Sequence, residues 1–317
     1  MIYSNIYDKS GNIIRQPIYN GTLNDADCKA KFIELMNAKA SALGMTGTTF
    51  TTPSGLDRFN NHSTAQDLLK LGIAVCGCHE ALKIWHTPSQ SFQIYGDNER
   101  TVNITNNVIK GSATDLGAYY RLLGGKGGSY DSSGLYYRAQ ILLVEINNMP
   151  VMLATISFGQ TSFNNMYKAC KELADMVKDT IEGKTPAEGE NLATLIADGG
   201  GYSACVVPNI PTAYDLGMTS AEFVARNEVV KNGESIVLVP ASTTKTMTML
   251  CALDTITDLD APIIVKSADI EGGSGTTFYD GDIVKAKDAL RIMMMESSNT
   301  MAQAIGRTVG GYLLQRG

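Results

Sequence analysis

The stretch Pro240-Ala241-Ser242-Thr243-Thr244-Lys245 decides how the rest of this sequence is interpreted. Residues 236–239 before it are strand-like, and the proline prevents that strand from continuing. Residues 243–254 keep an apolar face at helical spacing, which places Ser242 at the N-terminus of a predicted helix. Lys245 then lies on the same helical face as Ser242, and the free backbone N–H groups favour a developing anion there.

A serine and a lysine at this spacing are typical of acyl-transfer chemistry. A serine hydroxyl is a poor nucleophile until a base takes its proton, and a lysine serves as that base only if its pKa is lowered. Ser-x-x-Lys occurs once here, at Ser242 and Lys245, but chance produces about one such match in a chain of this length. The alternative is a capping serine followed by a surface lysine.

A second group of polar residues, Ser297-Ser298-Asn299, lies between two predicted helices at 286–296 and 300–309. Ser297 carries a hydroxyl and Asn299 carries an amide, and one residue separates them. Other Ser-x-Asn triplets occur at 10–12 and 162–164, so the triplet discriminates only through its context. The alternative interpretation of Ser297 and Asn299 is a helix break with caps.

A third group is Lys126-Gly127-Gly128-Ser129, which precedes two apolar runs at 136–146 and 151–158. These runs and the turn between them predict two antiparallel strands. An ammonium at a sheet edge meets a substrate carboxylate, and the glycines let a substrate backbone approach closely. Lys9-Ser10-Gly11 is a rival for this role, but Asp8 and Asn12 make it a turn.

The remaining sequence predicts further elements. A hairpin is expected over 1–20 and a helix over 24–43. A second helix is expected to run from the Ser63 cap to about Cys78. A long helix over 163–181 has one apolar face, which is expected to pack on the sheet. Residues 87–118 are polar and predicted to be irregular. Residues 183–201 interrupt every periodicity and are interpreted as a linker.

Composition limits the possible partners. The chain has 317 residues, of which 44% are hydrophobic, and a net charge of −6; a globular core is expected, whereas a nucleic-acid partner is not. The first residues have neither the basic lead nor the apolar stretch of a secretory signal. Cys76, Cys78 and His79 lack a second pair at zinc spacing, so we expect no metal and no cofactor.

The three polar groups together resemble the Ser-x-x-Lys, Ser-x-Asn and Lys-Thr-Gly motifs of penicillin-binding proteins and serine β-lactamases. The low-molecular-mass D-alanyl-D-alanine carboxypeptidases are the most similar group, also through residues 37–57 (NAKASALGMTGTTFTTPSGLD) and 61–68. The resemblance covers about 25–182 and 203–315. It implies an α/β (α+β) β-lactamase/transpeptidase-like fold, with an antiparallel sheet flanked by helices and a mostly helical lobe.

The motifs stand in an unusual order, because this family begins with Ser-x-x-Lys and ends with Lys-Thr-Gly. The resemblance therefore implies an N-terminal hairpin or arm (1–24), the second half of the family domain (25–182), a linker (183–201) and the first half (202–317). Circular permutation within one chain is one explanation, and a homodimer that exchanges halves is another.

The resemblance also implies roles. Ser242 would attack the terminal D-Ala-D-Ala bond of a peptidoglycan stem peptide, Lys245 would take its proton and Ser297 would relay a proton to the leaving amine. Asn299 would bind the substrate amide and Lys126 its carboxylate, next to Gly127 and Gly128, while the N–H groups of Ser242 and Ser129 would form the oxyanion hole.

The family further implies an extracytoplasmic location, in the cell envelope or secreted, and β-lactams as covalent inhibitors. Gly127 stands where the family has Thr or Ser, so a hydroxyl that holds the substrate carboxylate is missing. No glutamate resembles the deacylating element of class A β-lactamases. A carboxypeptidase is therefore preferred, with a serine β-lactamase or a non-catalytic peptidoglycan-binding relative as alternatives.

Overall fold

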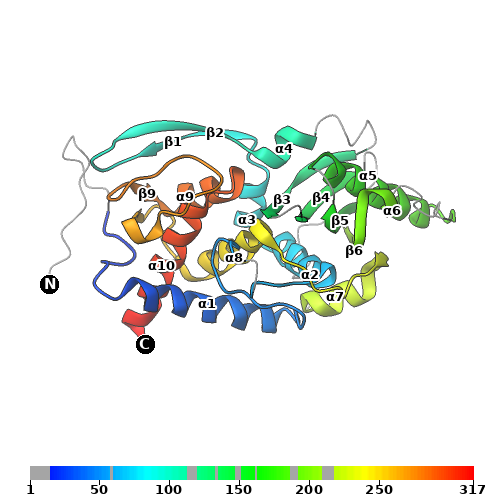
Figure 1. The fold of residues 1–317 in the computed structure, drawn as a ribbon, viewed down its shortest axis with the longest axis horizontal. Coiled ribbons are helices and arrows are strands. Elements are labelled where there is room, and N and C mark those ends of the chain that lie inside the picture. The colour runs from blue at the N-terminus through cyan, green and yellow to red at the C-terminus, as the bar shows by residue number, and fades with distance from the viewer. Residues whose placement is uncertain are drawn as a thin grey trace.

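The structure is a computed structural model that describes most of the chain. The described residues are 15–57, 60–112, 120–132, 135–146, 151–160, 163–185, 192–208 and 218–317. The mixed α/β class predicted from the sequence is confirmed, because antiparallel sheets are flanked by helices (Figure 1). The predicted hairpin over 1–20 falls mainly outside the described residues, and 15–20 form neither helix nor strand.

A five-stranded antiparallel sheet organises the molecule. Its strands, in spatial order, are β3 (Tyr120–Ser132), β4 (Leu135–Ile146), β5 (Val151–Gln160), β6 (Ile196–Pro208) and β7 (Glu228–Asn232). The two strands predicted from the apolar runs are confirmed as β4 and β5. β5 also pairs with β6, so the sheet joins the two halves of the sequence.

Both faces of this sheet are buried, because its apolar side chains alternate between two cores. Leu142 and Val144 of β4 pack with helix α5 (Phe163–Ile181) in one core. Ile141 and Leu143 point to the opposite face, where they join the larger core that includes α2 (Ala65–Cys76). The period of two along β4 explains this division. The predicted packing of the long helix on the sheet is confirmed.

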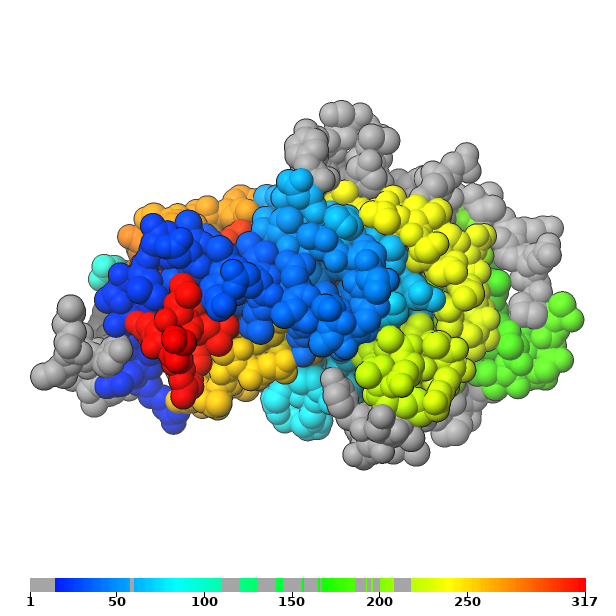
Figure 2. Space-filling view, turned by 90° about the horizontal axis from the view of Figure 1, so that it is seen from below, coloured from blue at the N-terminus to red at the C-terminus, as the bar shows by residue number. Residues whose placement is uncertain are grey.

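The helical lobe surrounds α8 (Thr244–Thr255), whose first nine residues are all buried. Its other helices are α1 (Asp25–Ala42), α3 (His79–Trp85), α9 (Ala286–Met295) and α10 (Asn299–Arg316). α1 packs along α10, and the two lie next to each other in Figure 2, coloured blue and red. An added Cβ at Gly310 would lie 1.8 Å from the carbonyl oxygen of Cys28, so only glycine permits this close helix contact.

The smaller elements complete the chain. They are β1 (Ser89–Ile94), β2 (Arg100–Thr105), α4 (Asn107–Ser112), α6 (Leu192–Leu195), α7 (Ser220–Asn227), the 3₁₀ turns η2 (Ala241–Thr243) and η3 (Ser267–Asp269), β8 (Pro262–Ile264) and β9 (Ile283–Lys285). β1 pairs with β2, and β8 with β9, as two separate two-stranded sheets.

Several element predictions were wrong. Residues 87–118, expected to be irregular, contain the hairpin of β1 and β2, whose Phe92, Ile94 and Ile104 face the core while their neighbours face solvent. Residues 236–239 form no strand; only Leu238 makes an isolated bridge, to Ser63. Thr64 caps α2 in place of Ser63, because its hydroxyl accepts the Asp67 N–H.

The expected linker is also shorter than predicted. α6 and the first residues of β6 lie within 183–201. Gly201, interpreted as part of a flexible stop, is instead a strand residue at a close backbone approach, since an added Cβ there would lie 2.2 Å from the Gly233 carbonyl oxygen. The helix expected over 300–309 extends over the whole of α10.

Candidate active site

Ser242 lies where the chain enters helix α8. It is the central residue of η2, and α8 follows immediately at Thr244. Ala241 has φ +48°, a left-handed conformation that turns the chain sharply before the helix. Ser242 is partly exposed while both Thr243 and Lys245 are fully buried, so the hydroxyl is accessible on a rigid support.

Lys245 reaches Ser242 and two other oxygens. Its Nζ lies 2.9 Å from Ser242 Oγ, 2.7 Å from Asn299 Oδ1 and 2.7 Å from the carbonyl oxygen of Ser54. A neutral amine has two N–H donors and one lone pair. It can donate to the carbonyl and the amide oxygen, which only accept, and accept the proton of the Ser242 hydroxyl.

The electrostatics favour that neutral amine. Burial lowers the pKa of Lys245 well below its usual value, and the positive charge of Lys126 lowers it further. A lysine in this state takes a proton from a serine at neutral pH, which an ordinary ammonium does not.

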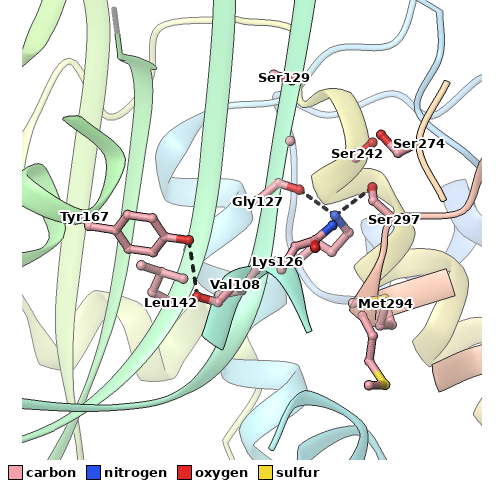
Figure 3. A pocket seen from close by; sticks show the side chains of 13 residues that line it. Val108, Lys126, Gly127, Ser129, Leu142, Tyr167, Ser242, Ser274, Met294 and Ser297 are labelled. Atoms are coloured by element: carbon pink, nitrogen blue, oxygen red, sulfur yellow. Dashed lines mark hydrogen bonds between the residues drawn. The ribbon is translucent and has the colours of Figure 1, made fainter. Parts of the chain in front are cut away.

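Lys126 approaches from β3 and contacts the second polar group. Its Nζ donates to Ser297 Oγ at 2.9 Å and also to the Gly127 carbonyl oxygen, as Figure 3 shows. Ser297 adopts φ +67° between α9 and α10, which turns its hydroxyl toward the lysine. Burial lowers the pKa of Lys126 to about 7.

The β3 backbone lies directly against the turn that carries Ser242. An added Cβ at Gly128 would lie 2.6 Å from the Ser242 nitrogen and 3.0 Å from the Thr243 nitrogen. Only glycine allows this approach, which brings the β3 backbone at Gly128, the residue before Ser129, against the N–H of Ser242. Two backbone donors on adjacent segments are the usual components of an oxyanion hole.

Asn299 connects this centre to a glycine-rich loop, residues 271–276. Its Nδ2 donates to the Gly272 carbonyl oxygen at 2.8 Å, while its Oδ1 accepts from Lys245. Glu296 holds the same loop, accepting from the Thr276 N–H at 2.7 Å and from the Thr276 hydroxyl at 3.0 Å. Burial raises the pKa of Glu296.

These groups line one cavity of about 310 Å³, which contains Ser242, Ser297, Lys126, Gly127, Gly128 and Ser129. The structure therefore brings together residues that are far apart in the sequence, such as Lys126 and Ser297, which are 171 positions apart, and Lys245 links Ser242 to Asn299. Ser274 of the glycine-rich loop lies beside Ser242 in Figure 3. The rival lysine, Lys9, lies outside the described residues.

Sequence reasoning missed three contributors: the Ser54 carbonyl, Ser274 and Glu296. A backbone carbonyl has no residue signature, although Ser54 lies within the stretch 37–57 that carries the resemblance. Ser274 lies among three glycines, and Glu296 immediately precedes Ser297. Proximity to a recognised motif is the one signal that points to Glu296.

Comparison with known proteins gives two family matches, one in each half. The family model of D-alanyl-D-alanine carboxypeptidases matches residues 25–118, and that of the β-lactamase enzyme family matches residues 213–315. The two halves of the chain are thus similar to two families of one superfamily, the serine D-alanyl-D-alanine peptidases and β-lactamases.

Two curated relatives of this superfamily are from Escherichia coli (strain K12). D-alanyl-D-alanine carboxypeptidase DacC is 37% identical over 78 residues, which are 25% of this chain and 17% of the relative. D-alanyl-D-alanine endopeptidase is 58% identical over 43 residues, 14% of each chain. The chain thus spans less than a fifth of either relative in these matches. No solved structure matches it.

Gly127, the residue at which the sequence departs from the motif that it resembles, lies in strand β3 beside Lys126. Among the described residues, no group of three His, Cys, Asp or Glu side chains is arranged to hold a metal, and none of the helices is long and apolar enough to cross a membrane.

Proposed function

We propose that this chain is a serine-type D-alanyl-D-alanine carboxypeptidase that forms an acyl-enzyme on Ser242. The 2.9 Å hydrogen bond between Lys245 Nζ and Ser242 Oγ carries the proposal. Burial of Lys245 supplies the lowered pKa that a lysine base requires. The substrate is a peptidoglycan stem peptide that ends in D-Ala-D-Ala.

Acylation begins when Lys245 accepts the Ser242 proton and Oγ attacks the carbonyl carbon of the penultimate D-alanine. The N–H groups of Ser242 and Ser129 bind the oxyanion. The amide C–N bond then breaks, and Ser297 relays a proton to the leaving amine while Lys126 donates to the Ser297 oxygen. Water hydrolyses the ester and restores Ser242.

Asn299 and Lys126 position the substrate in this mechanism. Because Asn299 Oδ1 accepts from Lys245 and one Nδ2 hydrogen is directed to Gly272, the other Nδ2 hydrogen is left for the substrate amide. The buried ammonium of Lys126 attracts the terminal carboxylate, which raises the pKa of that lysine again on binding. β-Lactams occupy the same positions and acylate Ser242. We propose a location outside the cytoplasm, in the envelope or secreted, because a peptidoglycan substrate is found there.

The experiment is incubation of the protein with benzylpenicillin, followed by intact mass measurement. A stoichiometric mass increase is expected, with loss of the adduct in Ser242→Ala and retention in the control Ser41→Ala, an exposed serine of α1. Release of D-alanine from diacetyl-L-Lys-D-Ala-D-Ala is expected to follow the same pattern. An unmodified wild-type protein would refute the proposal.

A β-lactamase is the second candidate, favoured by the match of residues 213–315 to that enzyme family. Fast turnover of nitrocefin without a lasting adduct would support it.

Gly127 favours a third candidate, a non-catalytic peptidoglycan-binding relative. Losing one hydrogen bond to a charged carboxylate costs about 1.5–3 kcal/mol, which weakens binding roughly ten- to a hundredfold without abolishing it. Binding of stem peptide with no D-alanine release would identify that case.

A further inference from the structure

The cavity at Ser242 extends beyond the groups that the proposed reaction uses. Its polar part contains Ser242, Ser297 and Lys126, whereas another part is formed by apolar side chains. Three of them come from different elements: Val108 of α4, Leu142 of β4 and Tyr167 of α5. We call these three residues the apolar wall; Met294 of α9 lines the cavity on the side of Ser297. Figure 3 shows Val108, Leu142 and Tyr167 on the side of Lys126 away from Ser242.

The apolar wall is fixed in place. Leu142 and Val108 are buried in the surrounding core. The Tyr167 hydroxyl donates to the Val108 carbonyl oxygen at 3.2 Å, which uses the polar end of that side chain and holds its ring against α4. A wall whose polar atoms are already hydrogen-bonded presents apolar surface to a ligand.

Lys126 and Gly127 lie between the wall and the reacting hydroxyl. A substrate carboxylate held by Lys126 places the C-terminal residue of the peptide at this point, since its amide must reach Ser242. Gly127 contributes no side chain there, so the side chain of the C-terminal residue lies next to the wall. A single methyl group, as in D-alanine, fills little of a 310 Å³ cavity.

We infer that the apolar wall is a specificity subsite for the side chain of the residue that leaves, and that the protein prefers peptides ending in a larger apolar D-amino acid, such as D-leucine, over D-Ala-D-Ala. The inference rests on the proposed peptidase function. Each methylene removed from water contributes about a fourfold gain in binding. D-Leucine adds three carbon atoms to D-alanine, and about tenfold or more in kcat/KM is expected from their partial burial.

The test compares diacetyl-L-Lys-D-Ala-D-Leu with diacetyl-L-Lys-D-Ala-D-Ala. Wild type should cleave the D-leucine peptide with the higher kcat/KM, by about tenfold. Val108→Thr keeps the shape of the wall but adds a hydroxyl, and it should lower the D-Leu to D-Ala ratio of kcat/KM severalfold. Val237→Thr makes the same change at an exposed valine that does not line the cavity, and it is the matched control, in which the ratio stays near that of wild type.

Binding and labelling separate the possible failures. Ser242→Ala should bind the D-leucine peptide more tightly than the D-alanine peptide, which tests the subsite without catalysis. Penicillin labelling of Ser242 together with equal or better use of D-Ala-D-Ala would overturn the subsite and leave the peptidase proposal intact. No labelling and no cleavage of either peptide would overturn both.

Discussion

The two buried lysines determine what the site can do at the level of single residues. Lys245 Nζ contacts two oxygens that can only accept hydrogen bonds, those of Ser54 and Asn299, and one hydroxyl that can also donate, that of Ser242. Lys126 Nζ contacts the Ser297 hydroxyl and the Gly127 carbonyl. Neither forms an ion pair with a carboxylate in the described ranges. Burial lowers both pKa values, and the charge of Lys126 lowers that of Lys245 further, against an opposing effect of Glu271. In the proposed mechanism, Lys245 is the base and Lys126 is the cation that binds the substrate carboxylate.

The pH dependence of acylation should reveal Lys126. Its pKa is lowered to about 7 in the free protein, so the ammonium loses its proton as the pH rises through that value. For a carboxylate substrate, kcat/KM should then fall about tenfold per pH unit above this point, because the free enzyme lacks its cation. Stopped-flow or steady-state rates between pH 6 and 9 measure this alkaline limb, which is the fall in kcat/KM above the pKa of Lys126.

Lys126→Arg provides the control for that limb. A guanidinium stays protonated throughout this range, so the alkaline fall should disappear in the variant, even if its activity is lower at every pH. A substrate with a C-terminal amide should lack the limb with the wild-type protein as well. An unchanged alkaline fall in Lys126→Arg would assign it to another group.

At the level of elements, periodicity decided what could be predicted. Helix α5 and strands β4 and β5 bury continuous apolar faces, which the sequence displays at periods of 3.6 and two. β1 and β2 are six residues each with polar outer faces, and only three of their side chains signal the core. The motifs predicted the site, but the loop containing Ser54 contributes a backbone carbonyl that no residue type encodes.

That loop gives a test with a matched pair of glycines. Gly55 has φ +82°, and an added Cβ would lie 2.0 Å from the Ala241 carbonyl oxygen, beside Ser242. Gly183 has φ +70° but nothing within 4 Å of an added Cβ. Gly183→Ala should cost about 1–2 kcal/mol in unfolding free energy through its backbone conformation alone, and Gly55→Ala about 1–3 kcal/mol more through overpacking.

The two variants should also differ in chemistry. Displacement of the loop moves the Ser54 carbonyl away from Lys245, so Gly55→Ala should acylate with penicillin at least about tenfold more slowly, whereas Gly183→Ala should acylate at the wild-type rate. Urea unfolding and the rate of adduct formation measure the two effects. Equal acylation in both variants would show that the loop does not position the lysine.

At the scale of the whole molecule, one chain assembles the site from both exchanged halves. The pairing of β5 with β6 joins the halves through the sheet, and α1 packing along α10 joins them through the helical lobe. Gln315 Nε2 donates to Asn20 Oδ1 at 2.8 Å, so the two ends of the described chain are in contact. Since one chain brings these residues together, we propose circular permutation within one chain as the explanation of the motif order.

A rearranged chain should therefore fold. Joining Gly317 directly to Met1 and opening the chain after the exposed Lys184 restores the order Ser242, Ser297, Lys126 without removing a residue. We expect this variant to form the penicillin adduct at close to the wild-type rate and, like wild type, to be monomeric by light scattering. The contacts between α1 and α10 and between β5 and β6 are the same in either order.

A variant opened between Met249 and Leu250 is the control, since it cuts the buried helix α8 and should not fold. A different pair of results would show that the halves are exchanged between two chains: wild type would be a dimer that labels with penicillin, and the rearranged chain would be a monomer that also labels. In that case, joining the ends would have allowed one chain to complete the site without its partner.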